Sequence, residues 1–369
     1  MTLHIDYHII QTVPPSNLNR DDTGSPKTAT YGGVRRARVS SQAWKRATRQ
    51  SFKGQLDASE LGVRTLRAVE LLVGRMQELS PGLDTATAQT LAAQTLKALG
   101  LSVKAKRKAQ DGDSPMTEYL IFFSNQQLDR LAALTLESGE KGPDAKSAKA
   151  AFDAAHSVDV ALFGRMVAND AQLNVDAACQ VAHAISTHAV TNEFDYYTAV
   201  DDKAPEEETG AGMIGTIEFN SSTLYRYATV NVDCLHDHLG DGTATVRAIE
   251  AFTRSFVTSM PTGKRNTFAN GTLPDAVVVM VRQGRPVNLV GAFEDPVKGD
   301  GGFVTASCEA LATHAAEVAD AFGGAPAKAW VSRVGARTAS LDTLGQHVDF
   351  ETLVREVGAA AEASLMGQG

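Results

Sequence analysis

Strand patterns in this chain are few and short, and the order in which they alternate with helical patterns limits the possible folds more than any other property. One strand pattern opens the chain, and others cover residues 214–219, 224–232, 276–281 and 287–290. Helical patterns begin at about Ser41 and cover residues 243–260. The order strand, helix, strand, strand, helix, strand is that of a split βαβ unit, so we expect an α+β fold.

The N-terminal segment predicts a strand that is buried on one face. Apolar Leu3, Ile5, Tyr7 and Ile9 alternate with polar or charged residues. A period of two gives a strand one buried side and one side that faces solvent.

A long helical segment interrupts the strand patterns. Helices are expected at residues 63–79, 85–99, 117–136, 145–155, 176–188, 305–322 and 341–365. Residues 192–215 contain Pro205, a run of three glutamates at 206–208 and three glycines. This composition predicts a loop or a hairpin arm.

Basic residues are concentrated in one part of an acidic chain. The net charge is −8, but residues 20–53 hold nine Lys and Arg residues against Asp21 and Asp22, a local charge of +7 that leaves −15 for the remainder. Such a division attracts a polyanion to one face and repels it elsewhere.

The helix that begins at Ser41 is expected to have a cationic face. Polar and basic side chains recur at i, i+3, i+4 and i+7, at Gln42, Lys45, Arg46 and Arg49. An ordinary solvated helix has the same pattern, so this face alone does not decide the function.

The residues upstream of this helix favour phosphate binding. Gly32 and Gly33 permit a close approach of the backbone, and a strand would place Arg36 and Arg38 on one face. The free N–H groups and positive dipole end of the helix N-terminus add to this preference.

Base-reading residues are hard to find. The aromatic-rich signature of an RNA-recognition strand does not occur. Tyr225 and Tyr227 share one strand face and could stack on bases, but core packing is the favoured interpretation. We therefore expect binding to the nucleic-acid backbone without sequence preference.

Other functional classes are disfavoured. No apolar run approaches the roughly 20 residues of a membrane-spanning helix, and no signal peptide opens the chain. Cys179, Cys234 and Cys308 lie far apart, without the spacing of a zinc or redox motif. We expect a cytoplasmic protein without membrane contact, cofactor or bound metal.

One enzymatic alternative stays open. Asp21 and Asp22, with His4 or His8, could hold a divalent metal and cut RNA. Adjacent aspartates in a polar loop are more often turn formers. A non-enzymatic RNA-binding protein is therefore favoured, with a metal-dependent endoribonuclease as the alternative.

Motifs along nearly the whole chain resemble the backbone subunit of type I-E CRISPR Cascade complexes, the CasC family. They are LNRDD (18–22), YGGVRRARVSSQ (31–42), WKRA (44–47), VDVALFGRM (158–166), AHAISTH (182–188), YTAVDD (197–202), YRYA (225–228), GK with TFA (263–264 and 267–269) and NLVGAFE (288–294). The helical insert near residues 85–150 matches weakly.

The resemblance implies a hand-like fold with a modified RRM or ferredoxin-like palm, a helical fingers insertion and a thumb hairpin or loop. The implied boundaries are 1–57 for the first part of the palm, 58–175 for the fingers, 176–191 for a palm helix, 192–223 for the thumb and 224–369 for the rest of the palm.

The resemblance also implies a function. Copies of such a subunit stack head to tail along a CRISPR RNA as a helical filament, and each thumb kinks the RNA at intervals. The bases between kinks pair with target DNA. The expected partners are therefore CRISPR RNA, target DNA, further copies of the chain and other Cascade subunits, with cleavage left to a recruited helicase-nuclease.

Site residues follow by position from the resemblance. The RNA backbone would be held by Arg20, Lys27, Gln42, Lys45, Arg46 and Arg49, with Lys264 and Asn266 in addition. Met166 and Thr198 would bracket the displaced nucleotide at each kink. Arg265 departs from the more usual glutamine, and related type III subunits cut RNA with a loop aspartate, which keeps Asp21 and Asp22 in view.

Overall fold

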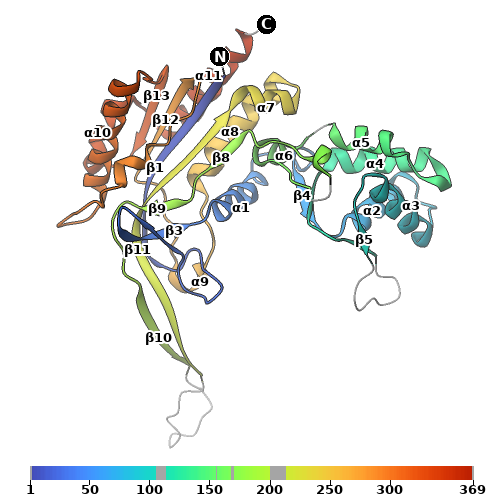
Figure 1. The fold of residues 1–369 in the computed structure, drawn as a ribbon, viewed down its shortest axis with the longest axis horizontal. Coiled ribbons are helices and arrows are strands. Elements are labelled where there is room, and N and C mark those ends of the chain that lie inside the picture. Colours follow the sequence, from blue (N-terminus) through green and yellow to red (C-terminus); the bar gives the residue numbers. More distant parts are fainter. Residues whose placement is uncertain (1, 105–113, 155, 168–169, 200–212, 368–369) are drawn as a thin grey trace, which may run out of the picture. The chain divides into compact units, whose positions relative to one another are not determined.

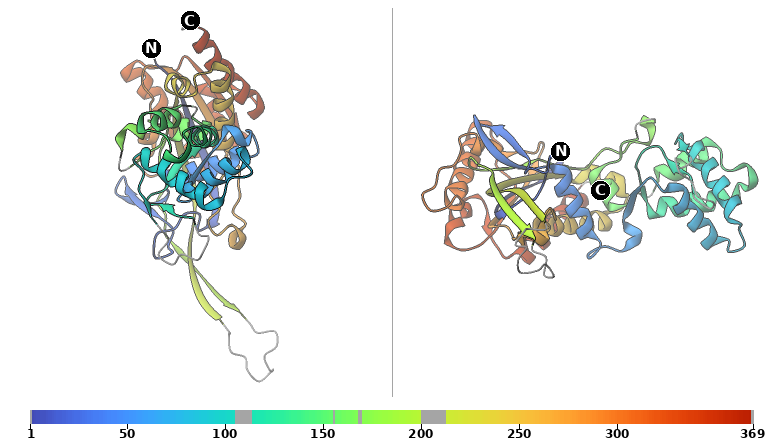
Figure 2. Two further views of the ribbon diagram at one scale, coloured as in Figure 1. Left: turned by 90° about the vertical axis from the view of Figure 1, so that its right-hand side faces the viewer. Right: turned by 90° about the horizontal axis from the view of Figure 1, so that it is seen from below.

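A computed structural model describes residues 2–104, 114–154, 156–167, 170–199 and 213–367. The chain forms two compact units (Figures 1 and 2). Unit 1 consists of Met1–Ser51, Val181–Val230 and Ile249–Gly369, and unit 2 of Phe52–Gln180 and Asn231–Ala248.

Unit 1 is built on a large mixed sheet with the strand order β14-β13-β12-β1-β11-β9-β3-β2. The strands are β1 (Leu3–Ser16), β2 (Thr28–Tyr31), β3 (Val34–Val39), β9 (Ala184–Ser186), β11 (Met213–Asn231), β12 (Ala276–Gln283), β13 (Lys328–Arg333) and β14 (Gln346–His347). β12 pairs antiparallel with β1 and β13, whereas β13 and β14 are parallel. The expected α+β class is confirmed.

Helices cover this sheet (Figure 1). They are α1 (Ser41–Phe52), α8 (Gly242–Thr258), α10 (Val304–Phe322) and α11 (Phe350–Met366), with 3₁₀ helices η4 (Leu289–Phe293) and η5 (Ala336–Leu344). The short helix α9 (Arg265–Phe268) lies in the loop after α8 and buries none of its residues. The helices expected at residues 243–260 and 305–322 are confirmed as α8 and α10. The helix expected at 341–365 begins only at Phe350, after η5 and β14.

β1 is buried on both faces, so the expectation of a half-buried strand is wrong. On one face the Tyr7 ring lies 5.3 Å from that of Phe252 in α8. On the other, Ile10 belongs to a core cluster with Leu311 of α10. The sequence did not show that a second helical layer covers the polar side of the strand.

The polar side chains of β1 are accommodated by partners in this second core. The Asp6 carboxylate accepts hydrogen bonds from Tyr227 Oη at 3.0 Å and the Val287 N–H at 2.9 Å. His8 stacks on Tyr225, and burial lowers the pKa of His8 to about 3. Tyr225 and Tyr227 are themselves buried, which confirms the core interpretation of this pair.

Residues 176–191 do not form the predicted palm helix. They contain β8 (Cys179–Val181) and β9, and Ile185 of β9 pairs with Arg38 on one side and Tyr225 on the other. The Ser186 hydroxyl accepts the Ala37 N–H at 3.0 Å. Alanine-rich sequence favours a helix locally, but two flanking strands supply hydrogen bonds that override this weak preference.

Two other strand predictions need correction. The patterns at 214–219 and 224–232 belong to one long strand, β11. Residues 287–290 form no strand, because the Asn288 side chain accepts the Val290 N–H at 3.0 Å and begins η4.

The irregular segment after residue 192 contains a hairpin arm. β10 (Glu193–Ala199) pairs antiparallel with the first part of β11, and the two strands extend beyond the rest of the sheet in Figure 1. Pro205 and the glutamates of the expected loop lie outside the described residues.

Unit 2 is mainly helical around its own apolar core. Its elements include η1 (Ala58–Glu60), β4 (Gly62–Thr65), α2 (Ala68–Leu79), α3 (Thr85–Ala98), β5 (Val103–Lys104), β6 (Met116–Thr117), β7 (Ile121–Ser124), α4 (Asn125–Glu137), η2 (Gly139–Lys141), α5 (Ala145–Asp153), α6 (Val158–Phe163), η3 (Ala171–Leu173) and α7 (Val232–Leu239). The helices expected at 85–99 and 145–155 are confirmed as α3 and α5.

Two predicted helices of unit 2 begin later than expected. Residues 62–65 and 121–124 pair instead as β4 and β7. Ser124 then starts α4 through a capping box, since its hydroxyl accepts the Gln127 N–H and the Gln127 amide accepts the Ser124 N–H, both at 3.0 Å. Across the described ranges, no helix has the length and apolar character needed to cross a membrane.

Candidate nucleic-acid interface

α1 begins where Ser40 caps its first turn. The Ser40 hydroxyl accepts the Ala43 N–H at 3.3 Å, as expected for a serine at this position. Trp44, 1% exposed, and Thr48 face the core of unit 1. The helix therefore has one buried side and one side available to a ligand.

A buried arginine holds the inner face of α1. The Arg226 guanidinium, from β11, lies 3.7 Å from the centroid of the Trp44 ring, and its Nη1 donates to Gln11 Oε1 at 2.6 Å. It also donates to the Phe256 carbonyl. Burial lowers the pKa of Arg226 to about 9. Stacking of this kind, shielded from water, fixes the rotation of α1 about its axis.

The outer face of α1 is the predicted cationic stripe. Gln42 and Arg46 are exposed, and Lys45 and Arg49 are partly exposed. The stripe that the helical period predicted is therefore confirmed as a surface.

A second group of basic side chains lies at the start of α1. The Ser41 N–H donates to His183 Nδ1 at 3.2 Å, which places the imidazole proton of the neutral ring on Nε2. Partial burial, together with nearby Arg38 and Lys27, lowers the pKa of His183. Lys27 was predicted as a site residue. Arg38 was predicted only as part of a strand face, and His183 was not predicted. His183 was missed because its segment was assigned to a helix.

The loop that carries Arg20 is held by asparagine and aspartate side chains. Asn19 Oδ1 accepts the Ser40 N–H at 2.8 Å, which ties the loop to the start of α1, and Arg20 is exposed. Asp21 Oδ1 accepts the N–H groups of Thr23 and Ser25, both at 3.0 Å, and the Thr23 hydroxyl at 2.7 Å. The Thr23 hydroxyl bond, followed by the backbone bonds, lowers the pKa of Asp21.

Asp21 thus has the geometry of a turn-forming residue. Within the ranges that the structure describes, no group of three or more His, Cys, Asp or Glu side chains could hold a metal ion. Neither observation favours the endoribonuclease alternative.

The loop after α8 approaches the Arg20 loop closely. A Cβ atom on Gly263 would lie 2.2 Å from the Leu18 carbonyl oxygen, so only glycine fits at this contact. Lys264 follows in the left-handed region, with φ 49°, and starts α9. Lys264 is partly exposed and Asn266 is exposed. The structure therefore brings this predicted pair next to the loop of Arg20.

Arg36 does not face a phosphate, contrary to the expectation for its strand. Its guanidinium is buried and donates to backbone carbonyls, including those of Thr187 at 2.7 Å and Phe293 at 2.8 Å. Gly32, with φ +58°, packs against Glu294, and an added Cβ would lie 1.6 Å from its carbonyl oxygen. The glycine and Arg36 of this motif are therefore structural.

Thr198 lies on the arm, beside exposed apolar side chains. It pairs with Ile214 and shares a face of β10 with Phe194 and Tyr196. Phe194, Tyr196 and Ile214 are 67%, 63% and 61% exposed. We call these four residues the arm face.

Met166 is displayed by a rigid turn in unit 2. Arg165 is buried, with its guanidinium 3.8 Å from the Phe152 ring centroid and its Nε donating to the Leu173 carbonyl at 2.8 Å. Burial lowers the pKa of Arg165 to about 10. Met166 is 82% exposed, which is unusual for an apolar residue anchored so firmly. Met166 is therefore not part of a hydrophobic core.

A family model described as "CT1975-like protein" matches residues 5–356. The chain belongs to the CT1975-like family. Two solved structures agree with this assignment. A chain of a "CRISPR RNA-guided surveillance complex, pre-nicking" is 36% identical, with a TM-score of 0.85 and coverage of 97% of this chain and 100% of that chain.

A chain of a "CRISPR RNA-guided surveillance complex" is 30% identical, with a TM-score of 0.75 and coverage of 97% of this chain and 99% of that chain. A comparison with curated proteins gave no match. The resemblance to Cascade subunits that the motifs indicated is confirmed.

In this CT1975-like protein, unit 1 gathers most of the predicted contacts. The stripe belongs to α1 itself, and the Arg20–Lys27 loop and His183 are hydrogen-bonded to the residues at its start. The Lys264–Asn266 loop packs in turn against the Arg20 loop. Thr198 stands apart on the arm, and Met166 belongs to unit 2. We call the stripe, the two loops and His183 the basic surface.

Proposed function

We propose that this chain is a non-catalytic backbone subunit of a type I-E CRISPR surveillance complex that binds CRISPR RNA. The observation that carries the proposal is the solvent-facing stripe of basic residues on α1, a helix held in place by the buried Trp44–Arg226 stack. The chain also belongs to the CT1975-like family. Lysine and arginine side chains in the stripe suit phosphates, whose contacts position a nucleic acid without reading its sequence.

The fold supports a palm of the RRM or ferredoxin-like kind. Four strands run in the order β12-β1-β11-β9, and α1 and α8 occupy the two helical positions of the split βαβ plan. In this proposal the basic surface holds the backbone of the guide, and Met166 and Thr198 bracket a displaced nucleotide at each kink.

The arm face supports assembly by copies of the chain. Apolar side chains this exposed are typical of surfaces that bind a partner. We propose that the arm contacts the next copy, that copies repeat head to tail along the RNA, and that the unkinked bases pair with target DNA. Other Cascade subunits and a recruited helicase-nuclease complete this cytoplasmic ribonucleoprotein.

Replacement of both Lys45 and Arg49 by glutamine tests the RNA-binding function. Each lost phosphate contact on a single strand makes the salt dependence of log K less steep by about 0.7, so the double variant is expected to lose about 1.4. Affinity for a repeat-derived RNA should fall, while the free energy of unfolding stays within about 0.5 kcal/mol. Fluorescence anisotropy across a salt series measures both the affinity and its slope.

The matched control replaces Lys298 and Arg337, both exposed and outside the basic surface, by glutamine. The control should leave the salt slope unchanged. Equal slopes for the wild type and the Lys45/Arg49 variant would contradict the proposal.

A further inference from the structure

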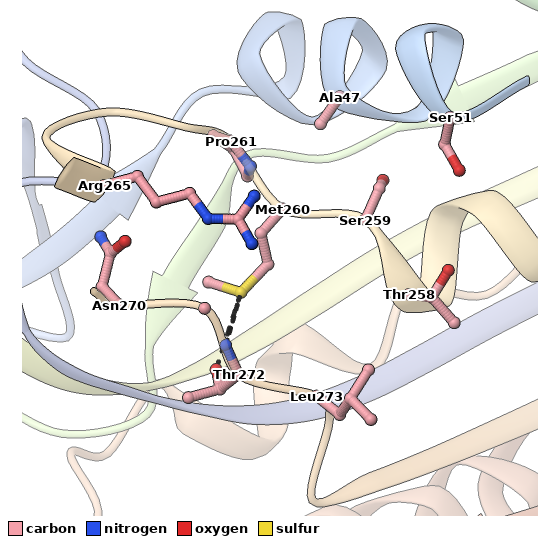
Figure 3. Close-up of a pocket in the computed structure, with 11 residues that line it drawn as sticks. Ala47, Ser51, Thr258, Ser259, Met260, Pro261, Arg265, Asn270, Thr272 and Leu273 are labelled. Atoms are coloured by element: carbon pink, nitrogen blue, oxygen red, sulfur yellow. Dashed lines mark hydrogen bonds between the residues drawn. The ribbon is translucent and has the colours of Figure 1, made fainter. Parts of the chain in front are cut away.

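A cavity of about 410 Å³ lies in unit 1 beside α1, between this helix and residues 258–273 (Figure 3). Ala47 and Ser51 of α1 form one wall, and Ser259, Met260 and Arg265 line other parts of it. Its volume is within the range of small-ligand sites, roughly 300–1,000 Å³.

The Arg265 side chain extends from α9 across this cavity toward Met260 (Figure 3). Its guanidinium lies over Gly271, since a Cβ there would stand 3.3 Å from Nη2. Within the described part of the chain, this guanidinium has neither an ion pair nor a hydrogen bond. Its five N–H donors are therefore available to a ligand.

The character of the lining selects the ligand charge. None of the described residues that line the cavity is an aspartate or glutamate. A guanidinium in a lining without carboxylates suits an oxyanion, and arginine binds phosphate oxygens in bidentate geometry. The volume exceeds that of a phosphate alone and leaves room for the attached sugar.

We propose that this cavity takes a phosphate of the guide RNA, held by Arg265. The inference rests on the proposed RNA-binding function and adds a contact to it. Arg265 stands between Lys264 and Asn266, and it also lines the cavity. A strand held by this loop can therefore place one phosphate in the cavity.

Replacement of Arg265 by glutamine should weaken binding of a repeat-derived RNA roughly tenfold, the effect of losing one charge-assisted contact. The salt slope should fall by about 0.7. Arg337→Gln, an exposed charge elsewhere in unit 1, is the control and should match the wild type.

The outcomes separate this inference from the proposed function. If the wild type does not bind RNA, the proposed function fails. If the wild type binds and Arg265→Gln matches Arg337→Gln in affinity and slope, the cavity contact alone is overturned.

Calorimetry with inorganic phosphate distinguishes the source of the oxyanion. In the proposed arrangement, phosphate binding is lost in Arg265→Gln and is blocked by prior loading with RNA. Phosphate binding that persists unchanged after RNA loading would assign the cavity to the free ion and overturn the RNA contact.

Discussion

Arginine side chains in this protein have two kinds of environment that look alike in sequence. Arg36, Arg165 and Arg226 are buried on carbonyls or aromatic rings, whereas Arg20 and Arg46 are exposed. The neighbouring groups decide whether an arginine is buried, because the three buried side chains lie beside aromatic rings or backbone carbonyls that accept their hydrogen bonds. Counting basic residues therefore overstates the charge that is available to RNA.

Separate replacement of Arg226 and of Arg46 by methionine should distinguish an arginine that stabilises the packing of α1 from one that binds RNA. Arg226→Met leaves buried acceptors unpaired and removes the stacking on Trp44, so the free energy of unfolding should fall by about 3 kcal/mol. Arg46→Met should change stability by less than about 0.5 kcal/mol but weaken RNA binding. Urea titrations and anisotropy measure the two effects. An Arg226→Met protein of unchanged stability would contradict the supporting role.

At the scale of elements, local patterns predicted well wherever a segment has one apolar face and a cap. α1, with Ser40 as cap and Trp44 inside, was predicted within a residue, and with it the stripe. Segments that depend on distant partners were not. β9 forms because β3 and β11 flank it, and β1 is buried twice because α10 covers its polar side.

The same limit applied to the site. His183 reached the start of α1 only through the pairing of β9, so no local pattern could have indicated it. Met166 and Thr198 came from motif resemblance alone. The cavity at Arg265 forms where residues 258–273 pack against α1. It could not be predicted from local sequence, because these segments lie about 200 positions apart in the chain.

The turn between β2 and β3 offers a matched test of close packing. Gly32→Ala places a methyl group 1.6 Å from the Glu294 carbonyl oxygen and should cost more than about 3 kcal/mol of stability. Gly33 has a similar φ, +75°, but nothing within 4 Å, so Gly33→Ala should cost only about 1–2 kcal/mol. Thermal unfolding of both variants checks the difference. Similar losses would show that φ alone, and not the contact with Glu294, requires glycine at residue 32.

For the whole molecule, the proposed function depends on contacts between copies. One basic surface offers few phosphate contacts, but subunits bound to the same RNA act at a high effective concentration. The arm face is an exposed apolar surface that can add protein contacts to this arrangement.

Replacement of Tyr196 and Ile214 by serine should therefore reduce assembly more than single-copy binding. On an RNA long enough for several copies, size-exclusion chromatography with light scattering should show shorter assemblies. On an RNA that accommodates one copy, affinity should stay within about twofold, since polar replacements on an exposed face disturb little else. Phe322→Ser, which removes an exposed side chain of α10, is the control. Assemblies of wild-type length would contradict a role for the arm face.

The stacking of Arg226 on Trp44 has a practical consequence for handling the protein. At 1 M salt the screening length is only about 3 Å, so contacts between exposed lysines and phosphates are lost, while pairs away from solvent are screened much less. The packing of α1 through Trp44 and Arg226 therefore survives salt concentrations that remove bound nucleic acid. Protein freed of nucleic acid at high salt should therefore return to low salt with its basic surface already formed. It should then bind a guide RNA that the experimenter adds.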